Sequence, residues 1–180
     1  FYFTSKGGYF YSVAAPEKSG GDWLLDDGSL RAVALENGGD AAHPAMSTCT
    51  PVVYNGRAYI GVSGTGQFTP YSGHNITVID LTGWRIAYSV PTQGYPQTSG
   101  LLTTAYGAED GTVYVYFFDN YTPGKLRVLK DAPGRTRAML TTEESYTVKG
   151  VTSTYTTPYV LFTPADAQAQ YAICSPITDS

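Results

Sequence analysis

The chain has 180 residues, with 15 acidic and 11 basic side chains and a formal net charge of −4. No basic cluster interrupts this weakly acidic background, which argues against a nucleic-acid-binding surface, and no apolar run approaches the roughly 18 residues of a membrane-spanning helix. Sixteen Tyr, 20 Gly and 11 Pro favour strands and turns. We therefore expect an all-β fold.

The first part of the chain contains two short aromatic runs around Gly7-Gly8. A glycine pair between two such runs predicts a hairpin over residues 1–13. A polar loop follows at residues 15–23, and residues 28–35 predict a third strand that ends in a turn near Gly38. These elements form a first unit.

The second unit is the clearest of the series. Residues 52–62 carry two apolar runs around Asn55-Gly56, the strongest short hairpin signal, because a type I′ turn needs positive φ at both central residues. A loop at residues 63–74 and a third strand at residues 75–83 follow. Residues 85–90 predict a weaker fourth strand, which completes a four-stranded unit.

The same order begins again at residue 104, with an Asp-Gly turn at Asp110-Gly111. The three expected third strands align at Leu30, Ile76 and Leu126, which lie 46 and 50 residues apart. This spacing is within the roughly 40–50-residue period of four-stranded propeller blades. We predict one all-β domain over residues 1–180, a β-propeller-like array of antiparallel blades whose units span about 1–48, 49–96 and 97–147, with a partial unit at 148–180.

The partial unit is opened by residues 157–161, whose sequence echoes residues 50–54. Three and a half to four blades leave sheet edges exposed. Phe1 is not a start methionine, and the first repeat begins part of the way through a unit. We therefore expect a piece of a larger propeller. It closes as a small ring, forms a homo-oligomer, or pairs with missing blades of its parent chain.

The two cysteines, Cys49 and Cys174, fall in units that are not adjacent in this arrangement. A disulfide needs Cα atoms within about 7 Å, so we expect two buried free thiols, with a bond between them as the alternative. His43 and His74 are the only histidines. No ligand set for a metal ion emerges from these residues.

Residues 50–62, followed by residues 76–83, resemble the pyrroloquinoline-quinone-like (quinoprotein dehydrogenase-like) β-propeller repeat. The resemblance implies a propeller; members include quinone-dependent alcohol dehydrogenases, outer-membrane assembly scaffolds and bacterial surface proteins without a cofactor. The tryptophan that the family places after Thr-Gly is replaced by Tyr88 after Thr82-Gly83. This departure, and the absence of the family's cofactor-site residues, predict that the chain binds no quinone.

Most carboxylates fall in turns such as Asp26-Asp27 and Glu109-Asp110. Turn Asp residues hydrogen-bond their own backbone, which explains these positions without catalysis. We therefore assign no catalytic residue and favour a protein that is not an enzyme. A segment of a quinone-dependent dehydrogenase-like propeller is the alternative.

The loops between second and third strands carry aromatic and polar side chains typical of recognition surfaces. We expect these loops to gather on one face and to bind a protein or glycan partner, although loops that merely cap the blades explain them equally well. The candidate binding residues are Trp23, Phe68, Tyr71, His74 and Tyr121. The predicted function is a non-catalytic binding or scaffolding module of a bacterial cell-surface or secreted protein.

Overall fold

The computed structural model describes residues 1–15, 17–19, 22–24, 27–40, 42–66, 68–104 and 111–164, without the side chains of residues 17–19, 22–24 and 27. Within these residues the chain is all-β, as predicted, and every strand pairing is antiparallel. A single 3₁₀ turn, η1 (Asp27–Ser29), is the one helical element of the described part.

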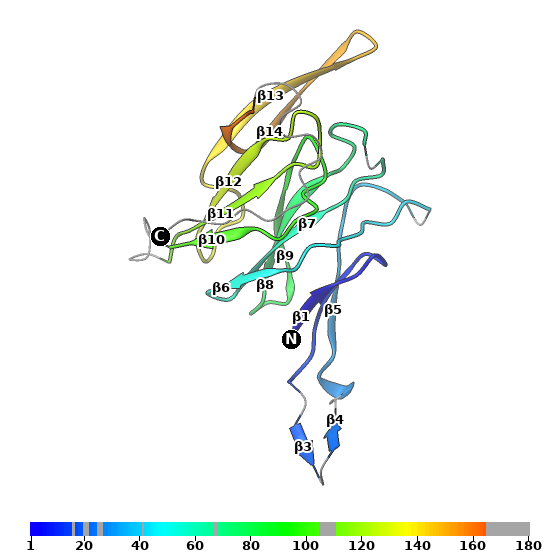
Figure 1. Cartoon of the computed structure of the whole chain (residues 1–180), viewed down its shortest axis with the longest axis vertical. Coiled ribbons are helices and arrows are strands. Elements are labelled where there is room, and N and C mark those ends of the chain that lie inside the picture. Colours follow the sequence, from blue (N-terminus) through cyan, green and yellow to red (C-terminus); the bar gives the residue numbers. More distant parts are fainter. Residues whose placement is uncertain are drawn as a thin grey trace.

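The strands form three main sheets and one small hairpin (Figure 1). The first sheet has the order β1-β2-β5, from β1 (Tyr2–Thr4), β2 (Tyr9–Ser12) and β5 (Arg31–Ala34). The hairpin, which projects from the lower end in Figure 1, pairs β3 (Glu17–Ser19) with β4 (Asp22–Leu24).

The second sheet has the order β6-β7-β8-β9, from β6 (Val52–Tyr54), β7 (Arg57–Val62), β8 (Asn75–Asp80) and β9 (Arg85–Pro91). The third has the order β10-β11-β12-β14-β13, from β10 (Leu101–Thr103), β11 (Val113–Phe118), β12 (Leu126–Asp131), β13 (Thr141–Val148) and β14 (Val151–Phe162). The second sheet is therefore the predicted meander of consecutive strands, and the third departs from it.

Local turn chemistry explains the hairpins. Asn55 and Gly56 have φ of 47° and 75° and connect Tyr54 to its partner Arg57, which is the expected type I′ turn. Gly8 ends the β1–β2 turn with φ of 85°. A Cβ at Gly8 would lie 2.3 Å from the carbonyl oxygen of Ala45, so only glycine fits there.

Residues 141–162 are arranged differently from our expectation. We expected residues 157–161 to open a fourth unit, but they belong to β14, which pairs with β12 and occupies the fourth position of the third sheet. β13 lies beyond it and is joined to β14 by Lys149-Gly150, with φ of 48° and 79°. This β13–β14 pair, which we name the long hairpin, extends past the sheet at the upper end of Figure 1.

The first unit also lacks the expected fourth strand. Between Leu35 and Pro51 the described residues form no strand, and Met46 makes only an isolated bridge with Ser63. Both edges of the first sheet, β1 and β5, are therefore without a neighbouring strand in the described part of the chain.

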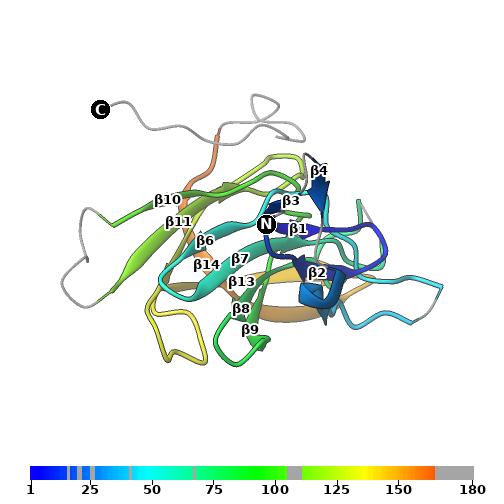
Figure 2. The same cartoon turned by 90° about the horizontal axis from the view of Figure 1, so that it is seen from below.

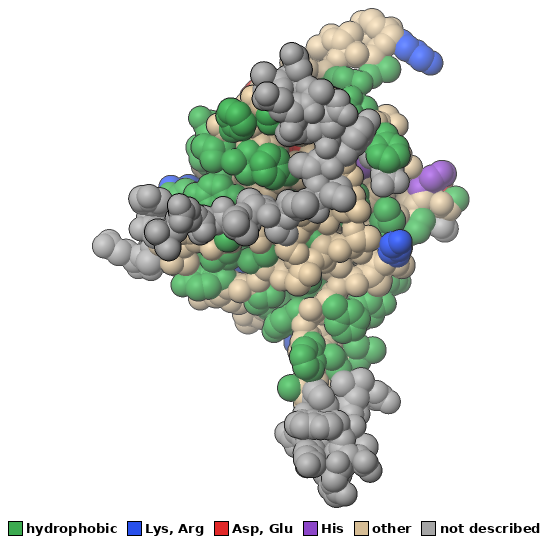
Figure 3. Space-filling view, in the orientation of Figure 1, with side chains coloured by type: hydrophobic (Ala, Val, Ile, Leu, Met, Phe, Trp, Pro, Cys, Tyr) green, Lys and Arg blue, Asp and Glu red, His purple; other side chains and the backbone are tan. Residues whose placement is uncertain are grey.

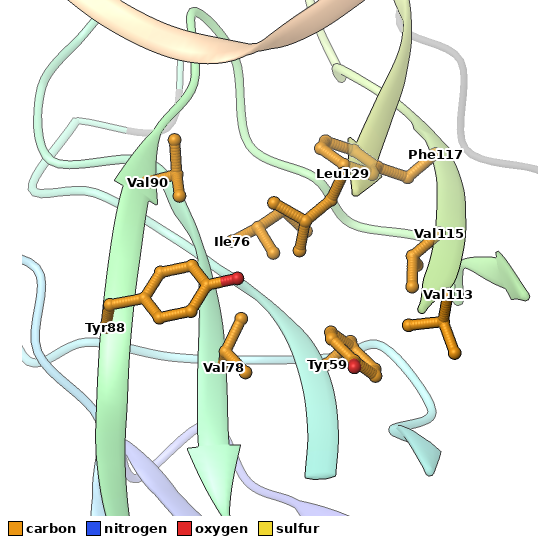
Figure 4. Packing of buried hydrophobic residues seen from close by; sticks show 9 residues of the cluster. All are labelled: Tyr59, Ile76, Val78, Tyr88, Val90, Val113, Val115, Phe117 and Leu129. Carbon is orange, nitrogen blue, oxygen red and sulfur yellow. The ribbon is translucent and has the colours of Figure 1, made fainter. Parts of the chain in front are cut away.

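The core lies on both faces of the second sheet. One face packs against the third sheet through the nine residues shown in Figure 4: Tyr59, Ile76, Val78, Tyr88, Val90, Val113, Val115, Phe117 and Leu129. The other face packs against the first sheet and the segment after it through Phe10, Leu35, Ala45, Cys49, Ala58, Ile60, Val62 and Ile79. Alternation along β7 sends Tyr59 to one core and its neighbours Ala58 and Ile60 to the other.

The three sheets consequently pack face to face in chain order, and Figure 2 shows the second sheet between the other two. In the described residues the sheets neither curl nor close on themselves. Cys49 is a free, buried cysteine whose pKa is raised by burial, whereas Cys174 lies outside the described residues.

Candidate functional site

The predicted loops do not all gather on one face. Asn37, just after β5, donates a hydrogen bond from its side chain to the carbonyl of Ser63, so this end of β5 adjoins loop 63–74. The loop between β2 and β5 lies at the other end of β5, where the amide of Ala14 donates to the hydroxyl of Ser29. Strand direction in the first sheet therefore separates this loop from the other two, contrary to the expectation.

The loops at residues 63–74 and 119–124 do lie near each other, because both contact the segment after β9. The amide of Tyr71 donates to the carbonyl of Gln93 at 3.0 Å, and the amide of Asn120 donates to the carbonyl of Tyr95 at 2.9 Å. Tyr121, a predicted site residue, is half-buried here. The largely buried segment 92–96 therefore holds these two loops near each other.

His74 is buried rather than presented to solvent. Its Nδ1 accepts a hydrogen bond from the amide of Gly64 at 2.8 Å, and its Nε2 lies 3.3 Å from the hydroxyl of Ser72. Burial lowers the pKa of the imidazole, which favours the neutral form. His74 therefore organises its loop from within. Phe68, on the same loop, is 60% exposed, and the side chain of Trp23 lies outside the described residues.

Tyr71 fastens loop 63–74 to the long hairpin. Its ring stacks on that of Tyr155 with centroids 4.1 Å apart and lies 5.7 Å from the ring of Tyr146. Burial, and then the nearby carboxylate of Glu144, raise the pKa of the Tyr71 hydroxyl. This aromatic contact holds the long hairpin against the body of the protein.

A buried ionic cluster lies at the base of the long hairpin. Arg127 donates from Nε to Oδ2 of Asp119 at 2.7 Å and from Nη1 to the hydroxyl of Thr157 at 3.0 Å. Its Nη2 lies 2.8 Å from Oε2 of Glu144, an ion pair outside hydrogen-bond geometry. Lys125 donates to the other oxygen of Glu144. The cluster thus ties β12 to both strands of the hairpin.

The pKa values of the two carboxyl groups of this cluster are shifted in opposite directions. Burial raises the pKa of Asp119 to about 6, partly offset by Arg127, and its Oδ1 has no hydrogen-bond partner. Burial also acts on Glu144, but the charge of Arg127 and the hydrogen bond from Lys125 outweigh it and lower the pKa to about 2. Glu144 is therefore the firmly ionised partner of Arg127.

A cleft with a volume of about 730 Å³ lies between β9 and the long hairpin. One wall is β9 at residues 88–91, the opposite wall is β14 at residues 154–156, and the floor is the segment 135–139 together with Thr141. The volume falls in the range of roughly 300–1,000 Å³ typical of small-ligand sites. It is the best candidate for a functional site in the described part of the chain.

The cleft has a distinct chemistry. Arg135 and Arg137 are exposed on its floor, and none of the described residues that line it is acidic. No ion pair joins either guanidinium to a described carboxylate. The lining also includes residues with hydroxyl groups: Ser89, Thr136, Thr141, Thr154 and Thr156. The arrangement suits a ligand that carries both negative charge and hydroxyl groups.

This cleft was not predicted from the sequence, because its walls come from strands far apart in the chain. Gly134 indicated only a turn, although two arginines follow it in the run Arg135-Thr136-Arg137. These two positive charges, with no acidic residue directly beside them in the sequence, are the one local feature that points to an anion-binding site. The long hairpin that forms one wall depends on the pairing of β14 with β12, which no local pattern indicates.

The described residues contain no group of three His, Cys, Asp or Glu side chains placed to hold a metal ion. In the part of the chain that the structure describes, no helix is long and apolar enough to cross a membrane. Compared with known proteins, the chain matches no protein family, no curated protein and no solved structure. A functional assignment therefore rests on the geometry of the cleft.

Proposed function

We propose that this chain is a non-catalytic binding module of a bacterial cell-surface or secreted protein, and that its ligand binds in the cleft between β9 and the long hairpin. The observation that carries the proposal is the pair of exposed arginines, Arg135 and Arg137, on the floor of a 730 Å³ cleft without described acidic residues. Charged groups in a concave site that have no ion-pair partner among the described residues favour a complementary ligand.

The walls of the cleft are held in place before any ligand arrives. β9 is paired with β8 along its length, with Val90 opposite Ile76 and Tyr88 opposite Val78. The opposite wall is fixed by the ring of Tyr155 on Tyr71. A preformed site loses less conformational entropy on binding than a mobile one, which supports a role in recognition.

A variant in which a large side chain fills the cleft tests this function. Thr154→Trp places a large ring in the cleft, whereas Thr152→Trp is a matched control, because both residues are exposed on the same face of β14. Each threonine also makes one cross-strand hydroxyl contact, Thr154 with Ser145 and Thr152 with Thr147. The intact chain is applied to a panel of immobilised glycans and peptides. We expect Thr154→Trp to weaken binding at least tenfold and Thr152→Trp to leave it unchanged; equal binding by both variants would contradict the proposal.

We also propose that the face-to-face sheets belong to a larger propeller-like array. The second sheet is covered on both faces, whereas the outer face of the first sheet exposes Phe3 and Tyr9, each 42% accessible, next to Tyr11. Figure 3 shows hydrophobic side chains gathered over this sheet. Such a face resembles the covered faces inside the chain, and in isolation we expect it to pair with a second copy.

Light scattering behind a sizing column tests this arrangement. The expected result is a dimer that Tyr9→Lys converts to a monomer, because a buried unpaired charge opposes association. Lys6→Glu, in the adjacent β1–β2 turn, is the control for a change of charge and leaves the dimer intact. A monomer at every concentration would contradict the proposed pairing without bearing on the cleft.

A further inference from the structure

We propose that the ligand of the cleft is an acidic glycan, whose carboxylate or sulfate groups pair with Arg135 and Arg137 while its hydroxyl groups bond the Ser and Thr side chains of the walls. This inference rests on the proposed function and gives the cleft a ligand class. It is supported by the charge, the hydroxyl groups and the backbone edges of the cleft.

The charge of the cleft is opposite in sign to that of the chain. The whole chain carries −4, yet the described lining of the cleft carries two positive charges and no negative one. Glu143 lies beside the cleft, where its Oε1 accepts a hydrogen bond from the hydroxyl of Thr156 at 2.6 Å. The guanidinium fork matches the oxygen pairs of carboxylate and sulfate groups, so the floor favours an anion.

The backbone that carries these arginines is anchored. The carbonyl of Arg135 accepts a hydrogen bond from Nη2 of Arg57 at 2.7 Å, and its amide donates to the carbonyl of Ala132 at 3.3 Å. Further along, the amide of Met139 donates to the carbonyl of Lys130 at 2.9 Å. Arg137 lies between these fixed points. The backbone positions of both arginines are therefore fixed. Fixed charges favour a ligand with anionic groups at a matching spacing over nonspecific binding of small counterions.

The walls supply groups that suit sugars. Ser89 on β9 and Thr154 and Thr156 on β14 are exposed hydroxyl residues. The hydroxyl of Thr156 donates to Glu143 and offers a ligand its oxygen as an acceptor, whereas those of Ser89 and Thr154 each share one contact with a neighbouring hydroxyl. Pro91 and Met139 add small apolar surfaces beside them. Sugar rings present hydroxyl groups at their rims and C–H groups on their faces, and this mixed lining is complementary to both.

The edge of β9 argues against an acidic peptide that adds a strand to the second sheet. β9 is an edge strand of the second sheet, and an extended peptide would bind by adding a strand to it. Pro91 has no N–H, and proline on an edge strand blocks such pairing. A glycan, in contrast, binds without the backbone hydrogen bonds that an added strand requires. The observations therefore favour a glycan over a peptide of equal charge.

Titration calorimetry of the intact chain with defined probes tests the ligand class. The probes are a heparin-derived hexasaccharide, a hexagalacturonate, neutral maltohexaose and a hexaglutamate peptide. We expect one acidic saccharide to bind at least tenfold more tightly than maltohexaose and hexaglutamate, and more weakly as salt is added, because the contacts are ionic. The sulfated and carboxylated probes separate the two sources of negative charge.

A charge-matched pair of variants assigns the effect to the cleft. The double variant Arg135→Gln/Arg137→Gln removes two positive charges from its floor, and Lys6→Gln/Lys149→Gln removes two exposed charges elsewhere. The first should weaken binding of the acidic saccharide at least tenfold, and the second by less than twofold. Equal weakening by both would overturn the inference, because general attraction would then explain binding.

The remaining outcomes distinguish a wrong ligand class from a cleft that binds no ligand at all. If maltohexaose or hexaglutamate binds most tightly, and Thr154→Trp abolishes that binding while Thr152→Trp does not, the cleft is a binding site but its ligand is not an acidic glycan. If no probe distinguishes Thr154→Trp from Thr152→Trp, the proposed function fails together with the ligand class.

Discussion

Arg57 and Asp131, 74 residues apart in the chain, form a buried ion pair between the second and third sheets. Nη1 of Arg57 donates to both carboxylate oxygens of Asp131, at 3.1 and 3.0 Å. The hydroxyls of Tyr59 and Tyr88 donate to the same carboxylate at 2.9 and 2.6 Å. Because Nη2 of Arg57 also bonds the carbonyl of Arg135, this pair connects the core with the floor of the cleft.

Replacing the carboxylate should therefore destabilise the fold strongly. Asp131→Ala leaves the buried Arg57 without its partner, and breaking a buried pair in this way costs about 3–5 kcal/mol. Tyr59→Phe removes one hydrogen bond to the same charged carboxylate and should cost less, about 1.5–3 kcal/mol. Urea unfolding measures both. A loss for Asp131→Ala no larger than that for Tyr59→Phe would show that the ion pair does not join the sheets.

The cluster at the base of the long hairpin predicts two opposite pH dependences. The pKa of Asp119 is raised from 3.8 to about 6 by burial, so this group binds its proton more tightly in the folded state. Its contribution to the free energy of unfolding is full below pH 3.8 and is lost as the pH rises through 6. The pKa of Glu144 is lowered from 4.5 to about 2, so its contribution is full above pH 4.5 and is lost as the pH falls through 2.

Urea unfolding between about pH 2 and 7 separates these two groups. Asp119→Asn should flatten the decrease in stability between about pH 4 and 6, and Glu144→Gln should flatten the increase between about pH 2 and 4.5. Each variant thus changes a different part of the profile. Profiles that run parallel to that of the unmodified chain over the whole range would contradict the assignment.

Trp84 joins the second sheet to the first. Its ring lies 5.5 Å from that of Phe10 and 4.3 Å from the guanidinium carbon of Arg31, and its Nε1 donates to the carbonyl of Ala32 at 3.1 Å. Trp84→Ala should cost about 2 kcal/mol, since a half-buried aromatic ring, a cation–π contact and a hydrogen bond are lost together. Trp84→Phe keeps the ring and should cost less. Thermal unfolding ranks the two variants, and equal losses would rule out a contribution of the ring.

The stack of Tyr71 on Tyr155 predicts how firmly the long hairpin is held. Tyr71→Ala removes the stack, so amide hydrogen exchange in β13 and β14 should become at least tenfold faster, with little change in β7 and β8. Tyr71→Phe retains the ring and should preserve most of the protection. Unchanged exchange in the alanine variant would mean that the ionic cluster alone holds the hairpin.

The features predictable from the sequence are those that short segments determine. The turn at Asn55-Gly56 follows from the positive φ that both residues adopt, and the strands of the second sheet follow from apolar runs between turn signals. The stacking of Tyr71 depends instead on Tyr155, which belongs to another sheet, and the burial of His74 depends on how loop 63–74 folds around it. No local pattern contains that information.

The third sheet shows the same limit in strand pairing. Residues 157–161 repeat the sequence of an opening strand, yet they pair with β12, because the long hairpin places β14 beside it. The turn that forms this hairpin is Lys149-Gly150, where a lysine takes the positive φ usual for Asn or Gly. The cleft arises from this pairing, so its two walls could not be assigned from residues 85–90 or 157–161 separately.

The most direct test of binding in the cleft is an amide chemical-shift map of the ¹⁵N-labelled chain, titrated with the acidic hexasaccharide that binds most tightly. We predict that the largest shifts fall at residues 88–90, 135–139 and 154–156, which line the cleft. Largest shifts in loop 63–74, or on the outer face of β1 and β2, would contradict this prediction.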